Sequence, residues 1–159
     1  MLIAAATGVG IVESLKLSAR VRYLEQYIGF ISTVETEIRY CAPSLAQILQ
    51  RHRGDSAFCA CFEDCAAEGE ETPFPERWEQ SVRRIPASSG LTGEDLRLIA
   101  DFGKGLGASD IEGQLSHCRL GTELAATRLD RAREEKQKKS RLYIMLGLCS
   151  GIGAALLLC

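Results

Sequence analysis

The residues of this chain that could bind a metal ion are three closely spaced cysteines, Cys59, Cys61 and Cys65, with His52 upstream. Thiolate and imidazole are preferred zinc ligands, and a structural zinc site needs four ligands. On a helix, residues two apart point to nearly opposite sides, so Cys59 and Cys61 are not expected to share an ion. Cys61 and Cys65 lack an obvious second pair of ligands. Packing as small apolar side chains is favoured, and no metal or cofactor is predicted.

Two further groupings contain residue types used in nucleophilic catalysis or phosphate binding. His117 and Cys118 are adjacent and lie on different faces of a helix, which argues against a Cys–His nucleophile. The stretch Gly103–Gly107 has three glycines around Lys104, but lacks the Gly-Lys-Ser/Thr ending and the preceding strand of a phosphate loop. Glycines that end a helix are the simpler interpretation.

Paired acidic residues are the remaining candidates for chemistry. Glu35 and Glu37 lie near Arg39 on one predicted helix, and paired carboxylates can act as acid and base. A solvated face or a contact for a partner protein is favoured instead. No catalytic residue is predicted, and the chain is not expected to be an enzyme.

Composition and charge narrow the class of protein. The chain has 159 residues, only four prolines and 6% aromatic residues, which favours helix over sheet. Between residues 55 and 112 there are thirteen acidic and five basic residues, so nucleic acid is not an expected partner. The seven cysteines are odd in number, and two lie in the apolar tail. We therefore expect free thiols in a reducing compartment.

The carboxyl-terminal residues predict a membrane helix. Residues 142–159 contain no charged side chain, and residues 128–141 carry seven basic and three acidic residues. An apolar tail behind a basic collar is typical of a helix that crosses a bilayer with the collar in the cytoplasm, near anionic lipid. Gly147, Gly151 and Ala155 are spaced four apart, so they could form a face for packing against another membrane helix.

The amino-terminal residues predict a shorter membrane segment. The apolar run from Leu2 to Val12 reaches only about 17 Å at 1.5 Å per residue, whereas the hydrocarbon core is about 30 Å thick. Lys16, Arg20 and Arg22 follow the run and place the middle of the chain in the cytoplasm. The predicted divisions are a marginal membrane segment at 1–17, a cytoplasmic helical bundle at 18–141 and a membrane helix at 142–159.

Apolar periodicity predicts an all-α fold of about six helices. One long helix is expected to end at Ala42-Pro43, and another to begin at a capping box formed by Ser109 and Glu112. Short helices are expected over 43–53, 56–68 and 75–85, with Asp55 capping the second, and a Thr92–Asp95 capping box starts a further helix. The two long helices should pack as an antiparallel outer pair that runs into the membrane segments. Their predicted apolar stripes are Val21, Leu24, Ile28, Ile31, Val34 and Ile38 in the first and Leu115, Cys118, Thr122, Ala125, Leu129 and Ala132 in the second.

Two stretches resemble the stage III sporulation protein AB family: residues 34–40 (VETEIRY) with Pro43, Leu45 and Leu49 after them, and residues 106–114 (LGASDIEGQ) with His117 after them. The resemblance implies a sporulation membrane protein on the mother-cell side of the outer forespore membrane, with a cytoplasmic domain similar to that of the type II secretion platform protein. It also implies a channel complex between mother cell and forespore, containing other stage III sporulation membrane proteins and a secretion-type ATPase, stage III sporulation protein AA. The resemblance implies a role in structure or partner contact for six residues: Glu35, Glu37, Tyr40, Ser109, Asp110 and Gln114. We predict that these residues, together with Arg39, contact a partner.

The preferred hypothesis is therefore a non-enzymatic platform or adaptor that couples this ATPase to the membrane assembly. Two alternatives remain. One is a metal or redox sensor that uses Cys59, Cys61 and Cys65 on a membrane-anchored helical domain. The other is a general component of a type II secretion-like system outside sporulation.

Overall fold

The computed structural model describes the backbone of residues 2–40, 45–52, 54–62, 65 and 72–158. Side chains are described within these ranges from residue 14 to residue 139, except residue 46. Over this part of the chain there are six α-helices, a short 3₁₀ helix and no strand, which confirms the predicted all-α class. The elements are α1 (Leu2–Tyr40), α2 (Leu45–Arg51), α3 (Ala57–Ala60), α4 (Phe74–Arg83), η2 (Ala87–Ser89), α5 (Gly93–Gly105) and α6 (Ile111–Leu158).

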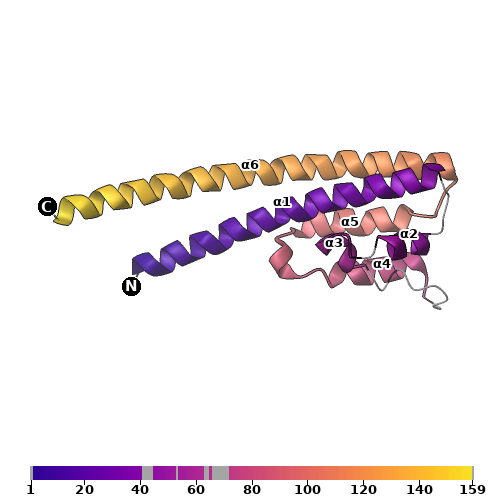
Figure 1. Ribbon diagram of the computed structural model, residues 1–159, viewed down its shortest axis with the longest axis horizontal. Helices are drawn as coiled ribbons and strands as arrows, with labels where there is room; N and C mark the ends of the chain where they lie inside the picture. Colours follow the sequence, from indigo (N-terminus) through magenta and orange to yellow (C-terminus); the bar gives the residue numbers. More distant parts are fainter. Residues whose placement is uncertain (1, 41–44, 53, 63–64, 66–71, 159) are drawn as a thin grey trace.

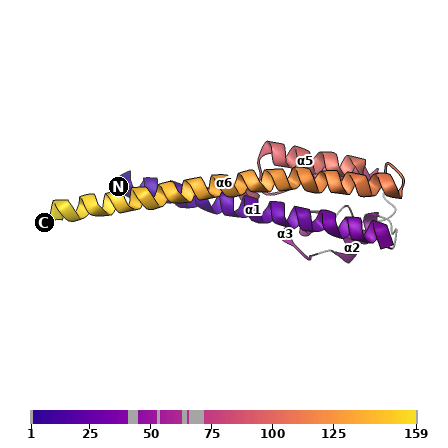
Figure 2. The ribbon, with the colours of Figure 1, turned by 90° about the horizontal axis from the view of Figure 1, so that it is seen from above.

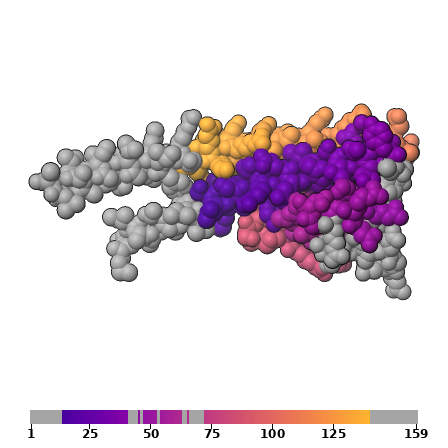
Figure 3. Space-filling view, viewed as in Figure 1, coloured from indigo at the N-terminus to yellow at the C-terminus, as the bar shows by residue number. Residues whose placement is uncertain are grey.

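The two long helices run antiparallel and form the length of the molecule (Figure 1). With 39 and 48 residues, α1 and α6 extend about 58 and 72 Å at 1.5 Å per residue. The described parts of both lie side by side in the space-filling view (Figure 3). α1 begins and α6 ends at the same end of the molecule. We call the opposite end, where α1 finishes at Tyr40 and α6 starts at Ile111, the distal end.

The short helices pack against the distal half of this pair. α5 lies alongside α6, whereas α2 and α3 lie on the α1 side (Figure 2). Most positions of both predicted apolar stripes are buried, because they are the positions at which the helices meet. Buried members are Val21, Leu24, Ile31, Val34 and Ile38 of α1 and Cys118, Ala125, Leu129 and Ala132 of α6.

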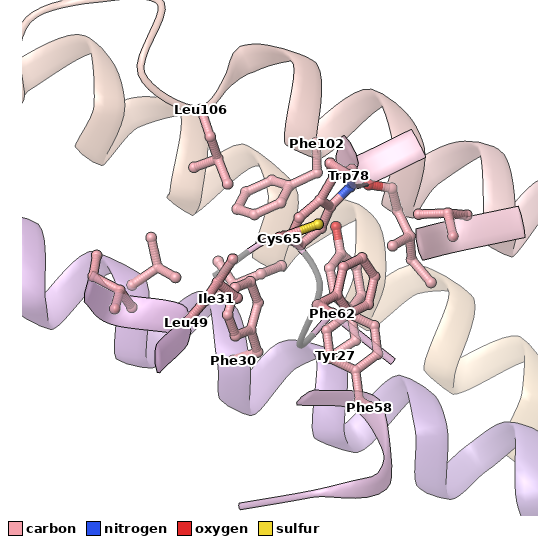
Figure 4. Packing of buried hydrophobic residues seen from close by; sticks show 14 of the residues in the cluster. Tyr27, Phe30, Ile31, Leu49, Phe58, Phe62, Cys65, Trp78, Phe102 and Leu106 are labelled. Carbon is pink, nitrogen blue, oxygen red and sulfur yellow. Dashed lines mark hydrogen bonds between the residues drawn. The ribbon is translucent and has the colours of Figure 1, made fainter. Parts of the chain in front are cut away.

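The core is an aromatic cluster in which the single tryptophan is central (Figure 4). Trp78 of α4 is fully buried, and its ring lies 4.1 Å from that of Phe62 and 5.8 Å from that of Phe30. Its Nε1 donates a 2.8 Å hydrogen bond to the carbonyl of Ile99, which satisfies the buried indole N–H. A Cβ at Gly103 would lie 2.0 Å from the Trp78 ring, so only glycine lets α5 approach this closely.

A buried ion-pair network joins three helices on the side of the core away from the distal end. Arg20 of α1 donates from Nε to Asp95 Oδ2 at 2.7 Å and from Nη2 to Asp95 Oδ1 at 3.2 Å. Its Nη1 donates to Glu135 of α6 at 2.9 Å. Arg20 is 4% exposed and Asp95 is fully buried at the start of α5. We call this group the Arg20 clamp, because one side chain ties α1 to both α5 and α6.

Helix boundaries in the middle of the chain depart from the sequence prediction. The helix expected over 56–68 is wrong in its length, since α3 ends at Ala60. Its cap is also different: Ser56, not Asp55, accepts the Cys59 N–H, at 3.1 Å. Two i to i+3 bonds follow, from Cys61 N–H and Phe62 N–H, and they tighten the chain into a turn. The chain leaves the helix at this turn, and the Phe62 ring enters the core.

The remaining boundaries are closer to expectation. α4 has proline in its first turn, as predicted, and ends at Arg83. The Thr92–Asp95 capping box of α5 is confirmed, with the Thr92 side chain accepting from Asp95 N and the Asp95 side chain accepting from Thr92 N. α2 (Leu45–Arg51) lies within the predicted 43–53, and residues 43, 44 and 53 fall outside the described residues.

The predicted membrane segments at 1–17 and 142–159 fall mostly outside the residues whose side chains are described. Helical backbone continues through both, from Leu2 and to Leu158. Among the described residues, no helix is long and apolar enough to cross a membrane. The predicted packing face of Gly147, Gly151 and Ala155 also lies outside the described side chains, so it stays a prediction.

Candidate partner-binding site at the distal end

The first set of predicted contact residues lies on the last turns of α1. Glu35 and Arg39, one turn apart, form an exposed ion pair of 2.6 Å. Arg119 of α6 also approaches Glu35, at 3.8 Å. Tyr40 ends the helix with 77% of its surface exposed, so its aromatic ring is available to a partner. Tyrosine and arginine are both enriched at protein interfaces.

Glu37 joins the end of α1 to α2. Both of its carboxylate oxygens accept hydrogen bonds of 2.7 Å from Nη1 of Arg51 in α2. His52 Nε2 lies 3.6 Å from the same carboxylate. Hydrogen bonding from Arg51 lowers the pKa of Glu37, with a smaller contribution from His52. Glu37 therefore holds α2 against α1.

The second set of predicted residues forms the turn from α5 to α6. The cap of α6 is Asp110, whose Oδ1 accepts the Gly113 N–H at 2.9 Å. The predicted capping box beginning at Ser109 is therefore wrong by one residue. Ser109 instead accepts a 3.1 Å hydrogen bond from the Gln114 side chain. A Cβ at Gly113 would lie 2.5 Å from the Ser109 hydroxyl, so the tight turn requires glycine there.

Gln114 is buried beneath this turn and stabilises it through hydrogen bonds. Only 6% of it is exposed. Its Nε2 donates to the carbonyl of Gly105 at 3.2 Å, and its Oε1 accepts the Gly107 N–H at 3.0 Å. Gly107 has a φ of 78°, in the left-handed region that glycine adopts without strain. The side chain thus satisfies backbone groups left open where α5 ends.

His117 packs against the same turn between α5 and α6, a role that the sequence alone did not reveal. Its ring stacks on Phe102 with centroids 4.9 Å apart, and its Nε2 is 2.8 Å from the Phe102 carbonyl. A Cβ at Gly105 would lie 2.4 Å from the imidazole. The prior signals were its place in the stretch that resembles the family and its spacing, three residues after Gln114, which places both side chains on one face of α6.

The two sets of predicted residues lie at one end of the molecule. α1 finishes and α6 starts at the distal end (Figure 1), and the contact between Arg119 and Glu35 joins them. Of the predicted contacts, Tyr40 and Arg39 are exposed, whereas Gln114 is buried. Ile111, which sequence reasoning missed, is 54% exposed at the first position of α6. The distal end is a surface suited to contact with another protein.

The cysteines are distributed over separate environments. Cys65 is buried, 3.2 Å from the Ser81 hydroxyl, whereas the Cys61 thiol donates to the Ala57 carbonyl within its own helical turn. Burial raises the pKa of Cys61, and it raises that of Cys118 to about 11, so both favour the unreactive thiol. Among the described residues, no three metal-ligating side chains gather at one point.

These features define an all-helical protein built on a long antiparallel helix pair with a compact helical domain at one end. A family model for stage III sporulation protein AB matches residues 1–159. The chain is also 25% identical over 163 residues to stage III sporulation protein AB of Bacillus subtilis (strain 168), covering 99% of this chain and 94% of that protein. The chain belongs to the stage III sporulation protein AB family, and this membership indicates a role in sporulation. No solved structure matches it.

Proposed function

We propose that this protein is a membrane-anchored, non-enzymatic platform of a secretion-like channel complex between mother cell and forespore. Its helical domain holds a secretion-type ATPase, similar to stage III sporulation protein AA, next to other stage III sporulation membrane proteins. Family membership supports the sporulation context. The observation that carries the platform role is the arrangement of the long helices: both extend from the helical domain toward one end, where α1 begins and α6 ends (Figure 1).

The charge pattern supports an anchor at that end. Residues 142–159 are uncharged, and the collar at 128–141 is basic. With this collar at the cytoplasmic face, the helical domain extends into the cytosol. From residue 17 to Tyr40 is 23 residues of helix, so the distal end stands about 35 Å from the membrane boundary predicted at residue 17. A partner on the distal end would be held at that height.

Co-purification of the cognate ATPase tests the distal end as its binding surface. We choose Glu35→Arg together with Tyr40→Ala, because both side chains are accessible, and leave Glu37 unchanged because it holds α2. The control is Glu76→Arg, an equal charge change on α4. The expected result is loss of the ATPase with the double variant only. Equal recovery with both variants would remove the distal end from the proposal.

Cell fractionation tests the anchor separately. We expect the full chain to stay with membranes after washing with alkaline carbonate. Leu148→Arg places a charge within the predicted membrane helix, at a cost of about 2.5–3.5 kcal/mol for a central position. We expect this variant to be released more readily than Gln80→Arg, which adds the same charge at an exposed position of α4 outside both predicted membrane segments. Release of the unaltered chain by carbonate alone would contradict membrane anchoring.

A further inference from the structure

Residues of α5 and α6 line an open groove. α5 lies on the side of α6 away from α2 and α3 (Figure 2). It consists of two adjoining hollows of about 450 and 530 Å³. They share four lining residues, Glu94, Arg97, Arg128 and Arg131, so they form one continuous surface. We call this surface the α5–α6 groove. It is separate from the distal end.

The two ends of the groove differ in chemistry. One hollow continues to Arg20 and Glu135 of the Arg20 clamp. The other continues to Leu98 and Leu124. Leu124 is 45% exposed, and Leu120, one turn before it on α6, is 53% exposed. The two leucines, one turn apart on α6, form a small exposed apolar surface next to the charged part of the groove.

Two arginines in the groove are left without direct ion pairs. Arg128 pairs with Glu94, and the pKa of Glu94 is lowered first by that hydrogen bond and then by the neighbouring charges, including Arg131. Arg131 and Arg97 are both exposed, and within the described residues neither lies within 4.0 Å of a carboxylate. Their guanidinium groups can therefore each bind a carboxylate of an incoming chain without breaking an existing pair.

We propose that the α5–α6 groove binds an amphipathic helix of a partner protein, with acidic residues on Arg97 and Arg131 and apolar residues on Leu120 and Leu124. Eleven residues separate Leu124 from Glu135 on α6, so the groove extends about 16 Å, or three turns of a bound helix. Apolar side chains spaced three and four apart on one face of such a helix match an exposed leucine pair that is itself one turn apart.

The direction of the groove distinguishes a protein from a lipid as its occupant. The leucine end lies toward the distal end, and the arginine end lies toward the carboxyl terminus of α6. In the proposed orientation a phospholipid would place its acyl chains nearest the membrane and its phosphate farther out. The groove has the reverse order, because its arginines lie nearer the membrane and its leucines lie farther out. A protein helix has no such constraint, because its acidic and apolar residues can occur in either order.

The inference does not depend on which protein is the partner, so it can hold even if the ATPase does not bind at the distal end. A photo-crosslinking amino acid is introduced in place of Leu124 in the full-length protein and expressed in sporulating cells. The control places the same amino acid at Gln80, which is exposed on α4 outside the groove. Crosslinked peptides are then sequenced. We expect a product from position 124 only, mapping to a partner segment with acidic residues and apolar residues three or four apart.

A second experiment reverses the charges of the two groove arginines and measures the yield of the crosslinked product. Each charged hydrogen bond contributes about 1.5–3 kcal/mol, so Arg97→Glu with Arg131→Glu should reduce the product at least about tenfold. The matched control is Arg83→Glu with Arg84→Glu, two exposed arginines at the end of α4, outside the groove lining and outside both basic flanks, which should leave the yield unchanged. Both double variants should unfold at the temperature of the unaltered protein. A crosslink to lipid, to a second copy of this chain or to a segment without acidic residues would overturn the proposal, as would no product or equal yields.

Discussion

Removing the carboxylate of Asp95 should destabilise the protein more than any other single change to a charged residue that we consider. Asp95→Ala removes two hydrogen bonds from Arg20, of 2.7 and 3.2 Å, and one from the Thr92 N–H, of 2.9 Å. Arg20 would then stay buried with Glu135 as its remaining partner in the clamp. Breaking a buried pair in this way costs about 3–5 kcal/mol, and loss of the capping interaction adds to it.

The expected loss can be measured by urea and thermal unfolding of the full chain in detergent. Trp78, the only tryptophan, is fully buried, so its fluorescence reports on the core. For a chain of this size, about 4 kcal/mol corresponds to a fall in Tm of about 8–16 °C. The control is Asp101→Ala on the same helix, whose exposed pair with Lys104 is worth less than about 1 kcal/mol. Equal losses for the two variants would refute the assignment of the Arg20 clamp as a buried structural ion pair.

Three further predictions use the same unfolding measurement. Gly103→Ala should destabilise the protein by about 1–3 kcal/mol because the added methyl group would meet the Trp78 ring. Gly29→Ala should stabilise it by up to about 1 kcal/mol, because a Cβ there meets no atom of another element within 4 Å. A change of unfolding free energy in the same direction for both variants would contradict the packing. Gln114→Ala should cost about 1–3 kcal/mol by leaving the Gly107 N–H unsatisfied, and no loss would mean that water replaces the side chain. Burial opposes ionisation of Asp95, but hydrogen bonds from Arg20 and Thr92 outweigh it and leave its pKa lowered. The Asp95 carboxylate therefore contributes its full stabilisation above its unfolded pKa of about 3.9, and this stabilisation is lost as pH falls through the lower folded pKa. The difference in unfolding free energy between wild type and Asp95→Asn should shrink below about pH 4. A difference that stays constant with pH would contradict the lowered pKa.

Local signals in the sequence predicted the long helices and several of their ends. The apolar stripes of α1 and α6 repeat every three or four residues, and such spacing needs no knowledge of the partner helix. The cap formed by Thr92 and Asp95 is equally local, because its atoms lie within four residues. The cap of α6 was placed one residue early because Ser109 and Asp110 are both good capping residues, and only the Gln114 hydrogen bond decides between them.

Features that depend on long-range contacts were not predictable. Arg20 was read as one of the basic residues after a membrane segment, yet it is buried against Asp95, 75 residues later. Nothing near Gly103 in the sequence indicates that the Trp78 ring covers it. Likewise, α3 is shorter than its apolar pattern implies because the core takes both Phe58 and Phe62, and the turn between them serves that packing. Each of these outcomes is decided by tertiary packing.

The Arg20 clamp and the α5–α6 groove can be separated by experiment although they share a boundary. Asp95 fixes the start of α5 against α1, and the first turns of α5 form one wall of the groove, so Asp95→Ala should lower both stability and partner binding. Arg97 and Arg131 make no direct ion pair among the described residues, so reversing their charges should lower binding while stability is kept. If instead the Arg97 and Arg131 variants unfolded as readily as Asp95→Ala, these arginines would belong to the structural network, and the argument for a groove that binds an acidic helix would fail.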